Sequence, residues 1–123
     1  MALDEKKILI IDTDEDDRNK LSSYLAHLNY KTESGKCLTD AVAKITVGNF
    51  TCMLLDVDLP EMKGYEAVSI LKSIAPDIKI IMTTKRNTKY LEAKVREQDI
   101  FFYFIKSFGE EELKLAINNV FCQ

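Results

Sequence analysis

Residues 51–74, TCMLLDVDLPEMKGYEAVSILKSI, contain a complete strand, loop and helix. The first five residues form a mostly apolar run of strand length, and the loop after them carries Pro60 and Gly64. Beyond the loop, apolar residues recur at the spacing i, i+3, i+4 and i+7, which places them on one helix face. These residues are Ala67, Ile70, Leu71 and Ile74. The segment therefore predicts a buried strand that is joined to an amphipathic helix.

The same alternation of apolar runs and helix-period segments extends in both directions from this unit. Strands are expected at residues 7–11, 30–34, 51–55, 78–83 and 101–105. Helices are expected around residues 21–28, 38–45, 67–74 and 113–120, and a helix with a thinner apolar face at 87–97. Successive parallel strands need crossover connections, and such crossovers are right-handed. We therefore expect an α/β fold, with a doubly wound five-stranded parallel sheet covered by helices on both faces.

The composition limits what the chain can do. Its 123 residues suit one hydrophobic core, and 46% hydrophobic with 30% charged residues is typical of a globular protein. The net charge of -3 gives no general attraction for nucleic acid, and no apolar run is long enough to span a bilayer. We therefore expect a single cytoplasmic domain over residues 1–123, with no output domain, no direct nucleic-acid contact and no membrane segment.

Polar side chains gather where the predicted strands end. In open parallel sheets, ligands bind outside the carboxyl ends of the strands, near the point where the strand order reverses. Acids follow the first and third predicted strands, whereas a hydroxyl and basic groups follow the fourth and fifth. The residues are Asp12, Asp14, Asp56, Asp58, Thr84, Lys85, Arg86 and Lys106. We expect these residues to meet at one edge of the sheet.

This set of side chains suits phosphoryl transfer. Carboxylates held close together repel one another, unless a hard cation or a lysine neutralises them. A Mg²⁺ or Mn²⁺ site is therefore expected, with one carboxylate acting as a nucleophile toward phosphorus. The metal, an ammonium group and a hydroxyl would then stabilise the charge on the transferred phosphoryl oxygens.

The chain resembles the receiver domain family of two-component response regulators over essentially its whole length. The segment LLDVDLPEMKG, residues 54–64, is similar to the phosphoacceptor segment of that family, with Asp56 in the acceptor place. Thr84 and Lys106 stand in the places of the family's switch hydroxyl and lysine, and Tyr103 stands in the place of its switch aromatic residue. The resemblance implies a flavodoxin-like sheet of order 2-1-3-4-5 with five helices, and a phosphorelay switch rather than an enzyme.

The resemblance also implies a role for each residue at the site. Asp56 would accept a phosphoryl group from a sensor histidine kinase or a phosphotransfer protein. The implied metal ligands are Asp12, Asp56 and the backbone carbonyl of Asp58, with Asp14 as an alternative. Thr84 and Lys106 would hold the phosphoryl oxygens, and Tyr103 would turn inward. The surface of the fourth helix, fifth strand and fifth helix would then change, and it is a candidate homodimer face.

Two departures from the family pattern concern the starts of helices. Thr13 replaces the second of two adjacent acids, which predicts weaker metal binding. We expect Thr13 to cap the first helix, with Asp16 as its partner. Ser107 replaces a proline after the lysine and, with Glu110, predicts a capping box for the last helix.

A third departure lies beside the expected phosphoryl group. Lys85 stands where the family usually has a small residue, and Arg86 follows it. A cation there would hold phosphate or modulate access to it. Otherwise a flexible lysine is expected to point to solvent.

Two alternatives remain open. One is a phosphatase similar to the haloacid dehalogenase superfamily, because residues 12–14 and 56–58 both fit its D-x-D opening, although the chain has no insertion large enough for a cap. The other is a pseudo-receiver, an interaction module that keeps the fold without the switch. Thr13 and Lys85 favour a pseudo-receiver, whereas Asp56, Thr84 and Lys106 oppose it. Labelling by a phosphodonor would distinguish these readings.

Overall fold

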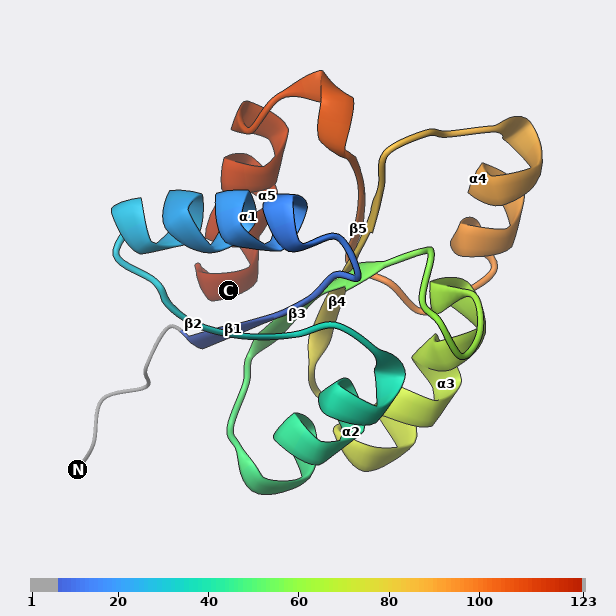
Figure 1. Ribbon diagram of the computed structural model, residues 1–123, viewed down its shortest axis with the longest axis horizontal. Helices are drawn as coiled ribbons and strands as arrows, with labels where there is room; N and C mark the ends of the chain where they lie inside the picture. The colour runs from blue at the N-terminus through green and yellow to red at the C-terminus, as the bar shows by residue number, and fades with distance from the viewer. Residues whose placement is uncertain (1–6, 123) are drawn as a thin grey trace.

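Five parallel strands form the central layer of the computed structural model, which describes residues 7–122 (Figure 1). The strands are β1 Lys7–Ile11, β2 Lys31–Gly35, β3 Cys52–Asp56, β4 Lys79–Thr84 and β5 Phe102–Ile105. They pair in the order β2-β1-β3-β4-β5. This is the expected flavodoxin-like order, and the strand order reverses at β1, because β2 and β3 lie on opposite sides of it.

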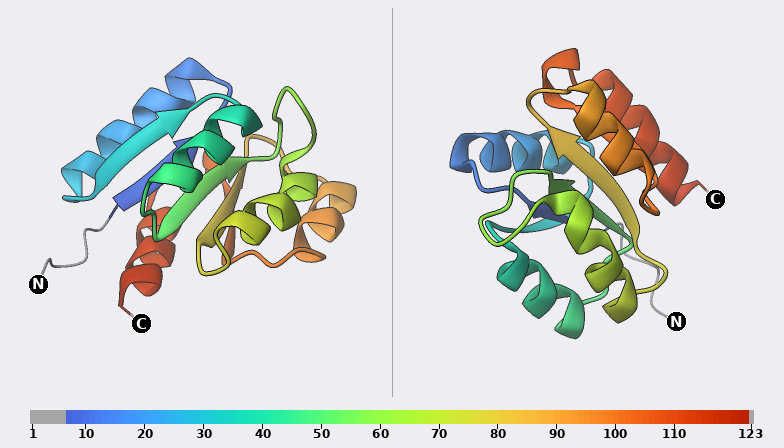
Figure 2. Two further views of the ribbon diagram at one scale, coloured as in Figure 1. Left: turned by 90° about the horizontal axis from the view of Figure 1, so that it is seen from below. Right: turned by 90° about the vertical axis from the view of Figure 1, so that its right-hand side faces the viewer.

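Five α-helices within residues 7–122 cover the two faces of this sheet. The helices are α1 Glu15–His27, α2 Leu38–Val47, α3 Gly64–Ile74, α4 Lys89–Arg96 and α5 Glu111–Phe121. Figures 1 and 2 show α1 and α5 on one face of the sheet, and α2, α3 and α4 on the other. The doubly wound α/β fold predicted from the sequence is therefore confirmed.

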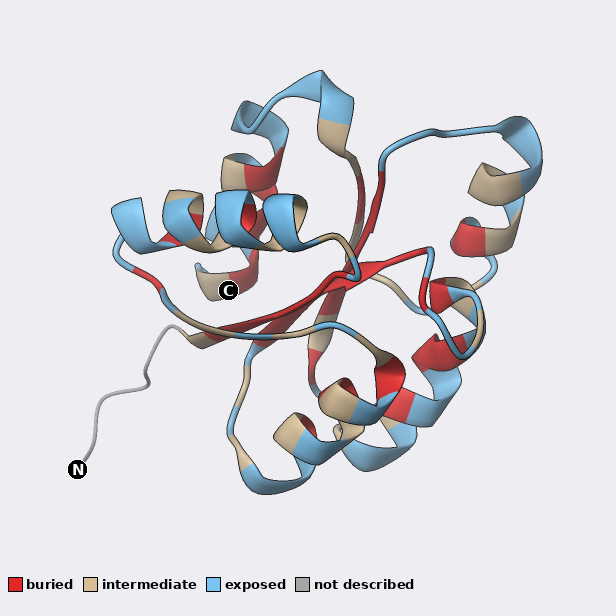
Figure 3. Ribbon diagram, viewed as in Figure 1, coloured by how far each residue is buried: buried red, intermediate tan, exposed pale blue. Residues whose placement is uncertain are grey.

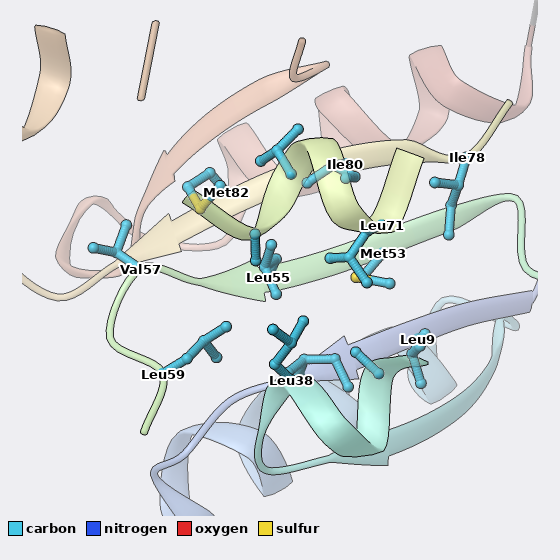
Figure 4. Packing of buried hydrophobic residues seen from close by; sticks show 14 of the residues in the cluster. Leu9, Leu38, Met53, Leu55, Val57, Leu59, Leu71, Ile78, Ile80 and Met82 are labelled. Atoms are coloured by element: carbon cyan, nitrogen blue, oxygen red, sulfur yellow. The ribbon is translucent and has the colours of Figure 1, made fainter. Parts of the chain in front are cut away.

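Each face of the sheet has its own hydrophobic core, because successive side chains of a strand point to opposite faces. Alternate residues of the inner strands pack under α2, α3 and α4, where Leu9, Met53 and Ile80 are buried (Figure 4). Their neighbours in the strands pack under α1 and α5, where Ile10 and Leu54 are buried. Burial is greatest along the inner strands, whereas the helices expose their outer sides (Figure 3). This double burial explains why the inner strands are apolar at nearly every position.

The strands begin and end within one residue of the sequence-based ranges, whereas α1 and α3 begin earlier than the ranges given by their apolar residues. Two predicted caps are wrong. Asp14, not Thr13, caps α1, because its carboxylate accepts the backbone N–H of Asp17. Ser107 lies in a short 3-10 turn, Lys106–Phe108, and α5 begins only at Glu111. Gly109 lies between them with φ of 89°, a backbone conformation that favours glycine, and it redirects the chain before α5.

The helix with the thinner apolar face is α4, as predicted. It is shorter than expected, and Val95 is its one buried residue. Thr88 caps it by accepting the backbone N–H of Leu91 at 3.0 Å. Among the helices of residues 7–122, none has the length and hydropathy needed to cross a bilayer.

Gly64 holds the start of α3 directly against the end of β3. Its N–H donates to the carbonyl of Val57 at 2.6 Å. A Cβ at this position would clash with the backbone of Asp56 and Val57. Backbone cannot move aside as the end of a long side chain can, so the close approach of α3 to β3 requires a glycine.

We predict that Gly64→Ala destabilises the protein by about 2 kcal/mol, the usual cost of forcing extra atoms into a packed interior. Chemical denaturation of both proteins would measure the difference. Ser69→Ala, at an exposed position of the same helix, should change the free energy of unfolding by less than about 0.5 kcal/mol. Equal stability of Gly64→Ala and the parent protein would show that α3 can move away from β3 at little cost.

Candidate functional site

Asp12 and Asp56 lie side by side because β1 and β3 are paired and end at the same edge of the sheet. The strand register pairs Ile11 with Leu55, so the next residue of each strand meets its counterpart at this edge. Both acids are buried, Asp12 completely. Lys106 follows β5 and reaches this edge from the other half of the sheet. The fold thus places two buried carboxylates and one ammonium at the point where the strand order reverses.

Both carboxylate oxygens of Asp12 accept a hydrogen bond. Its Oδ1 accepts the backbone N–H of Asp14 at 3.0 Å, and its Oδ2 accepts a bond from Lys106 Nζ at 2.6 Å. Its backbone carbonyl accepts a bond from the Arg18 guanidinium at 2.8 Å. A buried charge is stable when it is paired and hydrogen-bonded in this way. Asp12 is therefore fixed in place in the resting protein.

Asp56 is less well compensated. Its Oδ1 accepts the backbone N–H of Asp58 at 3.2 Å, while its Oδ2 lies 3.8 Å from Lys106 Nζ, beyond hydrogen-bonding distance. Burial raises the pKa of Asp56 to about 7, and the nearby Asp12 carboxylate adds to the effect, while the charge of Lys106 opposes it. Of the two buried acids, Asp56 is therefore the one whose carboxylate would be stabilised more by a bound cation or by a covalently attached group.

Lys106 is shared among three carboxylates. Besides its short contact with Asp12, Nζ donates to Asp17 Oδ2 at 3.1 Å. Burial alone would lower the pKa of Lys106, but the hydrogen bond from its ammonium to Asp12 and the charges of Asp56 and Asp12 raise it. The side chain is 12% exposed. Lys106 is therefore a charged group held at the edge of the core.

In the loop after β3, the side chain and the backbone carbonyl of Asp58 have different partners. The Asp58 carboxylate is 70% exposed and pairs with Lys63 at 2.9 Å. Its carbonyl instead accepts a hydrogen bond from Thr13 Oγ1 at 3.0 Å. The same hydroxyl lies 3.3 Å from the carbonyl of Lys36. Thr13 therefore ties together the loops that follow β1, β2 and β3.

Thr84 and Tyr103 both bond to the loop between β4 and α4. The buried Thr84 hydroxyl donates to the carbonyl of Arg86 at 2.9 Å. Tyr103 is buried, and its hydroxyl donates to Asn87 Oδ1 at 2.8 Å. Burial also raises the pKa of Tyr103. Tyr103 is therefore held against the loop between β4 and α4, and its inward turn on phosphorylation stays a prediction.

Lys85 does not extend freely into solvent. Its Nζ lies 2.8 Å from Asp14 Oδ2 and 3.4 Å from Asp17 Oδ2. The hydrogen bond from Lys85 and the backbone N–H of Asp17 lower the pKa of Asp14 to about 2. Asp14 is therefore engaged by its helix and by Lys85, away from Asp12 and Asp56. Arg86 is exposed.

Glu61 is a stabilising residue of this region that the sequence did not reveal. From the loop after β3, its carboxylate accepts the backbone N–H groups of Leu38 and Thr39 at 2.9 and 3.0 Å, and the Thr39 hydroxyl at 3.1 Å. These bonds lower the pKa of Glu61 to about 2. Glu61 thus caps α2 from another loop. An acid and a helix start 23 residues apart carry no local pattern that would predict this pairing.

The donor atoms suit a small hard cation. Within residues 7–122, no three His, Cys, Asp or Glu side chains are arranged to hold a metal ion. Mg²⁺ in proteins commonly keeps several waters and uses one or two carboxylates. The two neighbouring carboxylates of Asp12 and Asp56 fit that requirement, and the Asp58 carbonyl is a further oxygen on the loop that follows Asp56. The contact of this carbonyl with Thr13 occupies one of its two lone pairs and leaves the other available.

Comparisons with known proteins agree with this architecture. Residues 8–118 match a family model described as the response regulator receiver domain. Among curated proteins, the chain is 32% identical over 124 residues to the response regulator SaeR of Staphylococcus aureus and 29% identical over 121 residues to SaeR of Staphylococcus epidermidis. The matches cover 92% of this chain and 49% of each relative. The chain thus spans about half the length of the curated relatives it matches.

Solved structures show the same fold. A two-component response regulator from Clostridium difficile superposes with a TM-score of 0.89 at 21% identity, covering 97% of this chain and 98% of that one. The response regulator protein TrrA from Thermotoga maritima, solved in complex with Mg²⁺-BeF, has a TM-score of 0.82 at 26% identity, covering 94% of this chain and 98% of that one. The flavodoxin-like arrangement is therefore shared with these proteins.

The raised pKa of Asp56 predicts a pH-dependent difference between the protein and Asp56→Asn in EDTA. A carboxyl whose pKa is raised on folding stabilises the folded state below its unfolded pKa, near 4, and loses that stabilisation as pH rises through about 7. Asp56→Asn should therefore be more stable at pH 8, by about 2 to 4 kcal/mol, and close to the parent protein at pH 4.

Denaturant titrations at pH values from 4 to 8 would measure this difference. Asp77→Asn, at an exposed position between α3 and β4, serves as the matched loss of charge and should show no such slope. A difference that stays constant with pH, or that shrinks toward pH 8, would show that Asp56 is charged at little cost.

Proposed function

This chain belongs to the response regulator receiver domain family, and from that premise we propose that it is a phosphorylation switch with Asp56 as its phosphoacceptor. The single observation that carries the proposal is the position of the Asp56 carboxylate. It is buried at the end of β3, beside Asp12 and 3.8 Å from Lys106, and its own hydrogen bonding is incomplete. An Asp carboxylate can act as the nucleophile in a covalent step, and the nearby Lys106 ammonium supplies a positive charge beside it.

The proposed reaction transfers a phosphoryl group to an Asp56 oxygen. A new oxygen–phosphorus bond forms at Asp56, and the bond between phosphorus and the donor's nitrogen or oxygen breaks, with the electron pair leaving on the donor atom. Lys106, which has three N–H donors, would bind the transferred oxygens with the Thr84 hydroxyl. Mg²⁺ or Mn²⁺ held by Asp12, Asp56 and the Asp58 carbonyl would neutralise the charge that develops on the phosphoryl group.

The donor we propose is a sensor histidine kinase or a phosphotransfer protein, in the cytoplasm. Family membership supports this class of partner. The Mg²⁺-BeF complex of TrrA supports a metal site of this kind. The family match also argues against the phosphatase alternative, because residues 8–118 match the receiver domain model.

Acetyl phosphate with Mg²⁺ should add one phosphoryl group to the protein and none to Asp56→Asn, because that variant has no nucleophilic oxygen at the site. Intact mass measures the addition, and omission of Mg²⁺ should slow it. Equal labelling of Asp56→Asn would reject the assignment of Asp56. Absence of labelling in the parent protein would favour the pseudo-receiver, and multiple turnover of a generic phosphomonoester would favour the phosphatase.

The metal site has an unusual neighbour in Thr13. Its hydroxyl donates to the Asp58 carbonyl, the backbone group proposed as a metal ligand, and it supplies no charge. The site therefore relies on Asp12 and Asp56 for negative charge, while Asp14, the alternative ligand, is paired with Lys85. Both facts favour weaker Mg²⁺ binding than in a site with two adjacent acids.

Thr13→Asp should strengthen Mg²⁺ binding by about tenfold, or about 1.4 kcal/mol, and should lower stability in EDTA because it adds a further acid beside Asp12 and Asp56. A Mg²⁺ titration followed by fluorescence or calorimetry measures the first effect. Thr13→Ser, which keeps the hydroxyl, is the matched control. Unchanged or weaker binding in Thr13→Asp would show that the contact between Thr13 and the Asp58 carbonyl outweighs the added charge.

We also propose that the output surface is formed by α4, β5 and α5, and that it contacts a partner or a second copy of the chain. A phosphoryl group on Asp56 would draw the Thr84 hydroxyl away from the Arg86 carbonyl. Release of that carbonyl would loosen the loop to which Tyr103 is also bonded, through Asn87. Because α4 buries only Val95 completely, a shift of this helix should cost little.

Beryllofluoride, a mimic of the phosphoryl group, should change hydrogen exchange most between residues 84 and 108. Thr84→Ala should abolish that change while Asp56 remains open to labelling. Asp56→Asn treated with the same reagent serves as the control without binding. If the changes stay within the loops around Asp12 and Asp56, the proposed link between phosphorylation and this surface is wrong.

A further inference from the structure

Asp17, in the first turn of α1, binds two lysines through one oxygen atom. Its Oδ2 lies 3.1 Å from Lys106 Nζ and 3.4 Å from Lys85 Nζ. The two lysines come from different places, because Lys106 follows β5 and Lys85 follows β4. The Asp17 side chain is 17% exposed, so the contact lies at the rim of the site. Asp17 therefore connects the lysine of the site with the unusual lysine beside it.

In this structure Lys106 is closer to α1 than to the proposed phosphoacceptor. Its ammonium makes hydrogen bonds with Asp12 and Asp17, whereas Asp56 Oδ2 lies 3.8 Å away. A phosphoryl group on Asp56 would compete for the same ammonium, because a dianion attracts it strongly. Asp56 Oδ2 lies beyond hydrogen-bonding distance, so a movement of the ammonium toward it would lengthen at least one of the two existing carboxylate contacts.

Of the two contacts of Lys106, the one with Asp17 is the weaker and is expected to break first. Its bond to Lys106 is longer than the 2.6 Å bond of Asp12, and its side chain is more exposed than the 1% of Asp12. Asp17 and Lys106 also line an open groove of about 710 Å³ between α1 and α5, so water reaches this pair. A water-accessible ion pair is weaker than a buried one.

Lys85 is placed to replace Lys106 as the partner of Asp17. Its ammonium is anchored on Asp14, the N-cap of α1, at 2.8 Å, and the same ammonium already contacts Asp17. If Lys106 moves toward Asp56, Asp17 keeps a cation at its side and is not left unpaired. Without Lys85, Asp17 would depend on Lys106 alone among these two lysines and would hold it more strongly.

We propose that Asp17 is a positioning residue that retains Lys106 in the unphosphorylated protein, and that Lys85 is the counter-cation that allows Lys106 to move to the phosphoryl group. The proposal rests on the proposed function, because it concerns the same transfer to Asp56. In this proposal Lys85 acts by pairing with Asp17. It neither contacts the phosphoryl group directly nor blocks access to the site.

Four variants test the proposal by the rate of labelling with acetyl phosphate at saturating Mg²⁺, followed by intact mass. Asp17→Asn should raise the maximal rate constant by about fivefold, the effect of one partly exposed ion pair. Lys85→Gln should lower it by about the same factor. In Asp17→Asn, the further change Lys85→Gln should have no effect, because the residue through which Lys85 acts is gone. Lys85→Arg keeps the cation and should restore the parent rate.

The matched control is Asp16→Asn, which removes the same charge from an exposed neighbour in the same helix turn. It should leave the rate unchanged. A separate Mg²⁺ titration of each variant distinguishes a change in metal affinity from a change in the rate constant of labelling. The proposal is overturned if Asp17→Asn labels no faster than the parent protein, or if Lys85→Gln slows labelling equally in both backgrounds.

A failure of this proposal can be distinguished from a failure of the proposed function. If the parent protein is not labelled, Asp56 is not established as an acceptor, but the retention of Lys106 is still measurable. The ¹⁵N signal of its side-chain ammonium, recorded in EDTA, should show faster proton exchange in Asp17→Asn than in Asp16→Asn. Equal exchange in these two variants would overturn the proposal without any reference to phosphorylation.

Discussion

One ammonium group, that of Lys106, balances three carboxylates at the edge of the sheet, and the rest of the site is arranged around that contact. Asp12 takes the shortest bond from Lys106, Asp17 takes a longer one, and Asp56 lies beyond hydrogen-bonding distance. Burying acids next to one another is unfavourable unless cations compensate them. The unequal sharing leaves Asp56 as the undercompensated acid, and this is the physical reason to place the chemistry there. If Asp56 were fully paired, a metal ion or a phosphoryl group would stabilise it little further.

The loops hold this charge arrangement by contacts of a different kind. Thr13 links the loops after β1, β2 and β3 through backbone carbonyls, and Glu61 fastens the loop after β3 to the start of α2. Gly64 allows α3 to begin directly against the end of β3. These contacts fix the backbone around Asp56, whereas α4, which follows β4, has Val95 as its one buried residue. A switch that moves α4 requires this difference: a backbone that is fixed around Asp56, and a helix whose displacement costs little free energy.

The fold and the positions of the site residues follow from local patterns in the sequence. Strands are recognised from alternating or continuous apolar residues, and helices from apolar residues with a period of 3.6. Both patterns involve only residues that are close together in the sequence. Such patterns predict the strand ends, and therefore the meeting of Asp12, Asp56 and Lys106. The wrong expectations concern partner choice. Thr13 and Asp14 are adjacent candidates for one cap, and only the three-dimensional structure decides that Asp14 takes it while Thr13 reaches Asp58. The pairing of Lys85 with Asp14 joins residues 71 positions apart and leaves no trace in either local sequence.

Every step proposed for the switch begins with a phosphoryl group on Asp56, and the modified residue can be identified directly. Borohydride reduces an acyl phosphate to an alcohol, so a phosphorylated aspartate becomes homoserine. After treatment with acetyl phosphate and Mg²⁺, reduction and proteolysis, tandem mass spectrometry should find homoserine at position 56 and aspartate at positions 12, 14, 17 and 58. Homoserine at any of those other positions, with intact aspartate at position 56, would contradict the account.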